Sequence, residues 1–194
     1  RRNRLVGLAH ARLATHLRPD LVDAHLLIAE QMLSNEQYAL ASEAYRAVPE
    51  DAPEALDARI GLANALEGEA DVDAAVTALR EATRRWPREI DVHRALGDML
   101  RRNSRFEEAA EAYDGAIALI DEPENRHWPL YYSRGIALER SDQWPRAEED
   151  FRTALELEPD QPLVLNYLGY SWVEMGRNLA EAQEMIEKAV EQRP

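Results

Sequence analysis

The sequence contains no cysteine and only one lysine, Lys188, among its 23 lysine and arginine residues. Without cysteine the chain has neither disulfides nor thiolate metal sites, and its compartment stays open, because such a chain is compatible with any redox environment. No apolar run is long enough to cross a membrane, and the start shows no signal-peptide pattern, so we expect no direct membrane insertion. The preference for arginine over lysine is typical of a GC-rich, bacterial genome.

Basic residues are also in deficit overall. The chain has 37 aspartate and glutamate residues, which give a net charge of −14. A surface that binds phosphates needs a basic footprint, so we expect no nucleic-acid partner. The negative charge instead favours solubility and protein partners that are basic or mixed in charge.

Catalytic and metal-binding motifs are absent as well. No serine lies in a nucleophile-elbow context, and no glycine-rich loop could cradle a phosphate. Paired carboxylates such as Glu107 and Glu108 open predicted helices, where they stabilise the helix dipole. We therefore expect a non-enzymatic chain without catalytic residues, cofactor or metal. The five histidines show no recognised metal-binding spacing: they are His10, His16, His25, His93 and His127.

The most regular stretch runs over residues 90–123 and predicts two consecutive helices. Leu96, Gly97 and Leu100 lie in the first, and a polar break follows at residues 103–104. Glycine inside a helix costs about 1 kcal/mol relative to alanine, so Gly97 indicates the close approach of a neighbouring helix. A second apolar stripe follows at steps of three and four residues, the helical period: Phe106, Ala109, Tyr113 and Ala116.

The spacing of this hairpin recurs along the chain. The position of Gly97 holds Ala63 and Ala29 at successive steps of 34 residues before it, then Gly135 38 residues after it and Gly169 a further 34 on. A two-helix unit with this period indicates a repeat protein. The positions of Ala109 and Ala116 recur as small residues, with a proline five residues later in all units but the central one: Ala41, Ala75, Ala147 and Ala182; Val48, Ala82, Ala154 and Ala189; Pro53, Pro87, Pro159 and Pro194.

This pattern resembles the tetratricopeptide repeat (TPR) family over nearly the whole chain. The resemblance implies an all-α fold, a right-handed α-solenoid of antiparallel helix pairs forming one elongated domain. Arg59, His93 and Arg134 depart from the family pattern, because each stands where a bulky apolar residue is favoured. We expect these departures to loosen individual units without changing the fold.

The same spacing sets the expected repeat boundaries. Residues 1–21 correspond to the second helix of a truncated preceding repeat, so the chain is expected to be a fragment of a longer array. Four extra residues fall within residues 121–127 of the third repeat. The five repeats are expected at residues 22–55, 56–89, 90–127, 128–161 and 162–194.

In this family the first helices of the repeats line a concave groove, and the resemblance implies which residues face it. First-turn aspartates also stabilise helices without any ligand, and the tyrosines could instead pack against a following repeat, so both interpretations stay open. Tyrosines nevertheless often anchor interfaces. The expected groove is acidic in its first repeats and aromatic in its last: Asp23, Asp57, Asp91 and Asp98, interrupted by Arg94, then Tyr132, Asn166, Tyr167 and Tyr170.

The leading hypothesis is a non-enzymatic scaffold that binds a protein or peptide segment in this groove. The family's clamp for a C-terminal carboxylate needs basic residues at the second and sixth positions of some first helices, where this chain has none, so that ligand is not expected. Residues 165–194 resemble the closing repeats of bacterial cell-envelope TPR proteins, which implies an adaptor in the periplasm or at the outer membrane and leaves the cytoplasm open. The alternatives are a substrate-presenting region of a larger transferase, or a structural module that self-associates through open ends at residues 5–17 and 186–190.

Overall fold

The computed structural model describes residue 13, residues 15–18 and residues 21–192. Every regular element in this part of the chain is helical. The chain divides into two compact units, Arg1–Met99 and Leu100–Pro194. Of the helix predicted in residues 1–21, residue 13 and residues 15–17 are helical. Leu5 and Leu8, in the expected open end at residues 5–17, lie outside the described residues.

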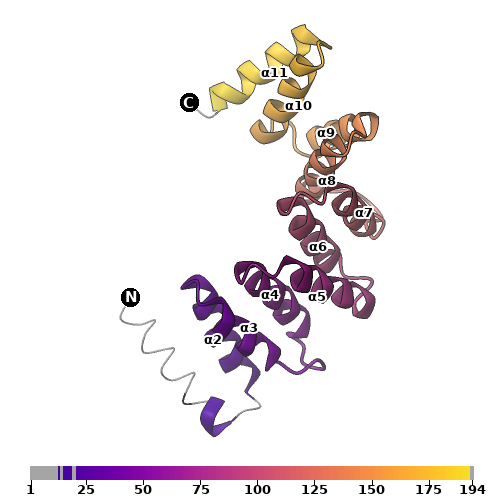
Figure 1. The fold of residues 1–194 in the computed structure, drawn as a ribbon. Helices are drawn as coiled ribbons and strands as arrows, with labels where there is room; N and C mark the ends of the chain where they lie inside the picture. The colour runs from indigo at the N-terminus through magenta and orange to yellow at the C-terminus, as the bar shows by residue number, and fades with distance from the viewer. Residues whose placement is uncertain (1–12, 14, 19–20, 193–194) are drawn as a thin grey trace. The chain divides into compact units, whose positions relative to one another are not determined.

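Helices follow one another in pairs joined by short turns (Figure 1). In the first unit α2 packs against α3, α3 against α4, and α4 against α5. In the second unit the packed neighbours are α7 with α8, α8 with α9, α9 with α10, and α10 with α11. The first unit contains α2 (Val22–Ser34), α3 (Tyr38–Arg46), α4 (Ala55–Gly68), α5 (Val72–Arg85) and most of α6 (Ile90–Arg102). The second contains the end of α6, then α7 (Phe106–Ile117), the short 3-10 helix η1 (Asn125–His127), α8 (Trp128–Arg140), α9 (Trp144–Leu157), α10 (Pro162–Glu174) and α11 (Leu179–Gln192).

One turn geometry joins the two helices of each pair. The residue after the helix cap has a positive φ, and the next N–H donates to a carbonyl five residues back, as from Gln37 to Met32 and from Arg177 to Trp172, both at 2.9 Å. This is the Schellman arrangement, which satisfies carbonyls at a helix end. Its left-handed residues recur with the spacing of the sequence repeat, and of the five only one is glycine: Glu36 (φ 59°), Ala70 (65°), Ser104 (60°), Asp142 (61°) and Gly176 (65°).

The small residues that recur in the sequence form the core of each unit. At these positions a helix lies so close to its neighbours that a larger side chain would overpack the core. The five alanines of one recurring position are each 0% exposed: Ala41, Ala75, Ala109, Ala147 and Ala182. The residues of the other position are at most 5% exposed: Val48, Ala82, Ala116, Ala154 and Ala189.

Glycines in the first helix of a pair make room for large side chains of the second. A Cβ atom added to Gly135 in α8 would lie 2.7 Å from Cε1 of Phe151 in α9. One added to Gly169 in α10 would lie 2.9 Å from Cγ1 of Ile186 and 3.0 Å from the carbonyl oxygen of Ala182, both in α11. Close helix approach therefore explains why glycine occupies these two helical positions.

Candidate functional site

Two of the predicted groove tyrosines, Tyr132 and Tyr167, lie in an aromatic cluster that joins α8, α9 and α10. The ring of Tyr132 lies 6.0 Å from Trp128, 6.1 Å from Phe151 and 6.0 Å from Tyr167, measured between centroids. Phe151 and Tyr167 are 5.2 Å apart. Ring pairs at such separations stabilise packing, so Tyr132 and Tyr167 hold the three helices together.

The hydroxyl of Tyr167 is fixed by a carboxylate on the neighbouring pair. It donates to Oε2 of Glu139, at the end of α8, over 3.0 Å. Burial raises the pKa of Tyr167 above its ordinary value, and the charge of Glu139 raises it further. Tyr167 therefore stays protonated at neutral pH and keeps the Glu139 carboxylate in a defined position.

Next to this hydrogen bond lies a pocket of about 380 Å³, which we name the α8–α10 pocket. It brings together three of the predicted groove residues, whereas Tyr132 lies behind it, against the ring of Tyr167. Tyr170 is the most accessible of the predicted tyrosines, with 53% of its surface exposed. The pocket is lined by Glu139, Arg140, Asn166, Tyr167, Tyr170, Ser171 and Glu174.

Two carboxylates and one guanidinium set the charge of the α8–α10 pocket. Glu139 and Glu174 supply the negative charges. The guanidinium carbon of Arg140 lies 4.8 Å from the ring centroid of Phe106 in α7, a cation–π contact. The pocket therefore combines an exposed aromatic ring with a net negative lining.

The predicted acidic groove residues all belong to the first unit, and they differ in whether a basic side chain offsets their charge. Asp91 and Asp98 flank Arg94 on α6, at oxygen–nitrogen distances of 2.9 Å and 3.6 Å, so part of their charge is offset. Asp23 and Asp57 lie exposed in the first turns of α2 and α4, where they favour the helix dipole. A pocket around His25 and Met32 and another around Arg59 and Trp86 include none of these five residues.

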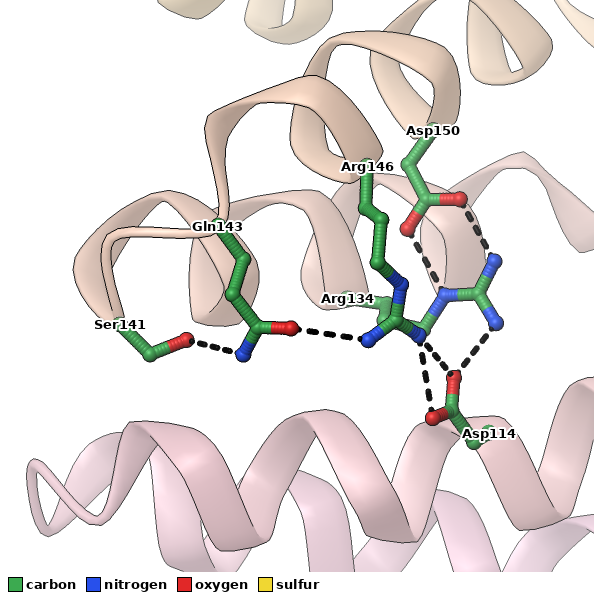
Figure 2. Close-up of polar contacts among 6 residues, drawn as sticks. All are labelled: Asp114, Arg134, Ser141, Gln143, Arg146 and Asp150. Carbon is green, nitrogen blue, oxygen red and sulfur yellow. Dashed lines mark hydrogen bonds and ion pairs between the residues drawn. The ribbon is translucent and has the colours of Figure 1, made fainter.

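The sequence interpretation missed a network of ion pairs in the second unit, shown in Figure 2. Arg134 of α8 donates to both carboxylate oxygens of Asp150 in α9, at 2.8 Å and 2.6 Å, and to Asp114 of α7 at 2.7 Å. Asp114 also accepts from Arg146, at 3.0 Å and 3.1 Å. The side chain of Arg134 thus joins three helices through ion pairs, so from the structure we expect it to hold its repeat together and not to loosen it.

Because the network is largely buried, the loss of one partner would leave an unpaired charge in the protein interior. The Asp150 side chain is only 4% exposed and that of Arg134 17%. Burial lowers the pKa of Arg134, but the hydrogen bonds and charges of Asp150 and Asp114 outweigh it, so the guanidinium pKa is raised. Burial raises the pKa of Asp150, and Arg134 opposes that rise through its hydrogen bonds and charge.

The other departures from the family pattern also find polar partners in the structure. Nη2 of Arg59 lies 3.1 Å from a carboxylate oxygen of Glu50, and Nε2 of His93 lies 3.1 Å from the carbonyl oxygen of Pro87.

His127 caps η1, since its Nδ1 accepts from the N–H of Glu124 at 2.9 Å. His10 lies outside the described residues. Within the described ranges no three potential ligand side chains gather as a metal site would require, and no helix is long and apolar enough to span a membrane.

Comparison with known proteins places this geometry in a family. Two tetratricopeptide repeat models match residues 62–123 and 128–161. A TPR repeat-containing protein of Pseudomonas aeruginosa is 29% identical over 119 residues, 61% of this chain and 20% of that protein. Human tetratricopeptide repeat protein 13 is 29% identical over 179 residues, 90% of this chain and 20% of that protein. The chain thus spans about a fifth of the length of these relatives.

Solved structures agree with the fold. A crystal structure of MamA matches with a TM-score of 0.70 and 18% identity over 84% of this chain and 93% of that one. A MamA structure from Desulfovibrio magneticus matches with a TM-score of 0.71 and 18% identity over 88% and 93%. At this identity the likeness shows the fold, an all-α solenoid of helix pairs. With its recurring small residues, its paired helices and these matches, the chain belongs to the tetratricopeptide repeat family.

Proposed function

We propose that this chain is a non-enzymatic interaction scaffold that binds a segment of a partner protein, with the α8–α10 pocket as its anchoring site. Tetratricopeptide repeats serve as protein–protein interaction scaffolds, and we assign that role on this chain to the pocket. The observation that carries the proposal is the half-exposed ring of Tyr170 beside a pocket of about 380 Å³. Tyrosines gain a large contact area at a small cost in entropy, so they often dominate binding energy.

The surroundings of Tyr170 support an anchoring role. Tyr167 is held by Glu139 and by the aromatic cluster, so one wall of the pocket is already ordered before a partner arrives. A preformed wall lowers the entropy that binding must overcome. Asn166 is exposed on the same helix and lines the pocket, where its amide can donate to and accept from a partner backbone.

The test is a pull-down from a lysate of the source organism with matched baits. The N166A/Y170A variant removes two exposed side chains, whereas replacing Tyr132 or Tyr167 would disturb packing. Val190→Ala on α11 is the control, because Val190 is 58% exposed and lies outside the pocket. We expect a partner that the wild type and the control retain and the N166A/Y170A variant loses. Equal retention by all three baits would refute the pocket as the binding site.

Circular dichroism and thermal unfolding of each bait would show that the variants keep the fold. Truncation of one hot-spot aromatic side chain typically costs about 2 kcal/mol or more of binding free energy. We therefore expect at least a tenfold loss of affinity once the partner is purified, since about 1.4 kcal/mol corresponds to tenfold.

For cellular location, we propose that the intact protein is an adaptor of the bacterial cell envelope. The support is the resemblance of residues 165–194 to the closing repeats of such proteins. Fractionation of cells with an antibody against this chain would test the location. Recovery of the intact protein only in the cytosol would contradict it.

A further inference from the structure

We propose that the occupant of the α8–α10 pocket is an arginine side chain from a basic segment of the partner. This inference rests on the proposed function and adds the chemistry of the ligand. Its basis is the pairing of two pocket carboxylates with one exposed aromatic face, a combination suited to a planar cation.

The carboxylates supply the charge complementarity. Glu139 uses one oxygen to accept from Tyr167, and a carboxylate has about four lone-pair positions, so it can accept further donors. Glu174 lies exposed at the end of α10 and lines the same pocket. The net charge of −14 for the chain adds a longer-range attraction for a basic segment and speeds its association.

The aromatic ring selects arginine over lysine. A guanidinium is planar, stacks on aromatic rings and presents five donors in a fixed fork, whereas an ammonium is a compact point charge. Stacked on the exposed face of Tyr170, a guanidinium could donate to Glu174 and to the amide oxygen of Asn166 at once. The second unit itself places guanidiniums over rings in this way, with Arg152 at 5.1 Å from Trp172 and Arg140 at 4.8 Å from Phe106.

An acidic ligand would fit this pocket less well. A carboxylate or phosphate would face two glutamates, and like charges brought together cost binding free energy. Arg140 is the one basic residue in the lining, and its guanidinium lies over the ring of Phe106. The charge balance of the pocket therefore favours a cation.

The experiment uses an array of random 12-residue peptides probed with the whole chain. Retained peptides are synthesised again in free form, with each arginine replaced in turn by citrulline, which has nearly the same shape and no charge. We expect one citrulline replacement to weaken binding at least tenfold. Glu174→Gln should weaken the arginine peptide by a similar factor and leave the citrulline peptide within about twofold, because both changes remove the same ion pair.

Glu184→Gln is the matched control, because Glu184 is exposed on α11 outside the pocket and its replacement changes the net charge equally. Peptides that need Tyr170 for binding but tolerate every citrulline would overturn the arginine assignment and leave the proposed pocket standing. An array on which no retained peptide needs Tyr170, or on which none is retained, would overturn both. If Glu174→Gln and Glu184→Gln weakened binding equally, the attraction would come from the overall charge of the chain, and the arginine assignment would be refuted.

Discussion

Replacing Arg134 by leucine should cost about 3–5 kcal/mol of unfolding free energy, although leucine is the residue that the family pattern favours there. The change removes two hydrogen bonds from Asp150, whose side chain is 4% exposed, and leaves that carboxylate buried without its cation. Breaking a buried ion pair by removing one partner typically has this cost. Replacing both residues, as R134L/D150V, removes both charges with only a small change in combined side-chain volume, so we expect a stability within about 1 kcal/mol of the wild type.

The double replacement leaves the remaining members of the network satisfied. Asp114 keeps Arg146 at 3.0 Å, and its side chain is 41% exposed, so it does not become a buried unpaired charge. Urea unfolding followed by circular dichroism gives the four free energies of the cycle. Repeat arrays can unfold in stages, so coincident transitions by tryptophan fluorescence are needed before the energies are compared. A cost below about 1 kcal/mol for R134L, or a double variant as unstable as the two single changes summed, would refute the reasoning.

Acid should partly rescue R134L. Burial already raises the pKa of Asp150, and loss of the guanidinium that opposes this rise should raise it further. A carboxyl whose folded-state pKa exceeds its unfolded value, about 3.9, binds its proton more tightly in the native state, so its contribution to stability falls as pH rises through the folded pKa. The deficit of R134L relative to the wild type should therefore shrink as pH is lowered from 7 toward 4.5. A deficit that is constant over this range would contradict the burial of an ionised Asp150 in the variant.

Three further tests concern the turns, a glycine inside a helix and the part-buried hydroxyl of Tyr167. Ala70→Gly should stabilise the chain by about 1 kcal/mol and Gly176→Ala should destabilise it by a similar amount, because both residues have φ of 65° and only glycine adopts it freely; thermal unfolding would measure both. Gly135→Ala should cost about 1–3 kcal/mol in urea unfolding, since its Cβ would lie 2.7 Å from Phe151, and Phe151→Leu in the same chain should relieve part of that added cost. At pH 8 the wild type should be more stable than Tyr167→Phe by about 1 kcal/mol or more. This advantage should shrink above pH about 10, because the unfolded tyrosine ionises there while the raised pKa keeps the native one protonated. Urea unfolding at pH 8 and 10.5 measures it, and an equal advantage at both pH values would contradict the reasoning.

The core could be predicted from the sequence because its signal is periodic. Ala109 and its equivalents recur at a fixed spacing, and small residues repeated at that spacing are what close contacts between helices require. The turns carry a weaker signal: a polar break marks the one at residues 103–104, but Ala70 and three other non-glycine residues of these turns adopt the left-handed conformation that glycine usually marks. Their hydrogen bonds and the packing of the flanking helices impose the conformation there.

The candidate site could be predicted only in part. Asn166, Tyr167 and Tyr170, three of the predicted groove residues, line one pocket, but the packing of Tyr132 and Tyr167 depends on how Phe151 of α9 fits between the helices. The burial of Asp150 was equally hidden, because Asp150 lies in the middle of α9 and an aspartate is almost never fully buried unless it is paired. Its partner lies 16 residues away, on another helix.

The Arg134 network also affects which hairpins stack on one another in a chain of similar repeats. Hairpins that share the same small core residues could stack on a wrong neighbour with comparable apolar contact, and such exchanged pairings are a common folding error of repeat proteins. The position equivalent to Arg134 holds an apolar residue in each of the four remaining predicted repeats: Ile28, Leu62, Leu96 and Leu168. Arg134 and Asp150 belong to one hairpin and pair with each other whatever stacks on it, whereas Asp114 comes from the preceding hairpin and accepts from both Arg134 and Arg146. A wrong neighbour would forgo the two ion pairs of Asp114, so these contacts favour the hairpin that carries it. Deletion or exchange of either hairpin would break these ion pairs, which ties the two hairpins together when repeats are gained and lost in evolution.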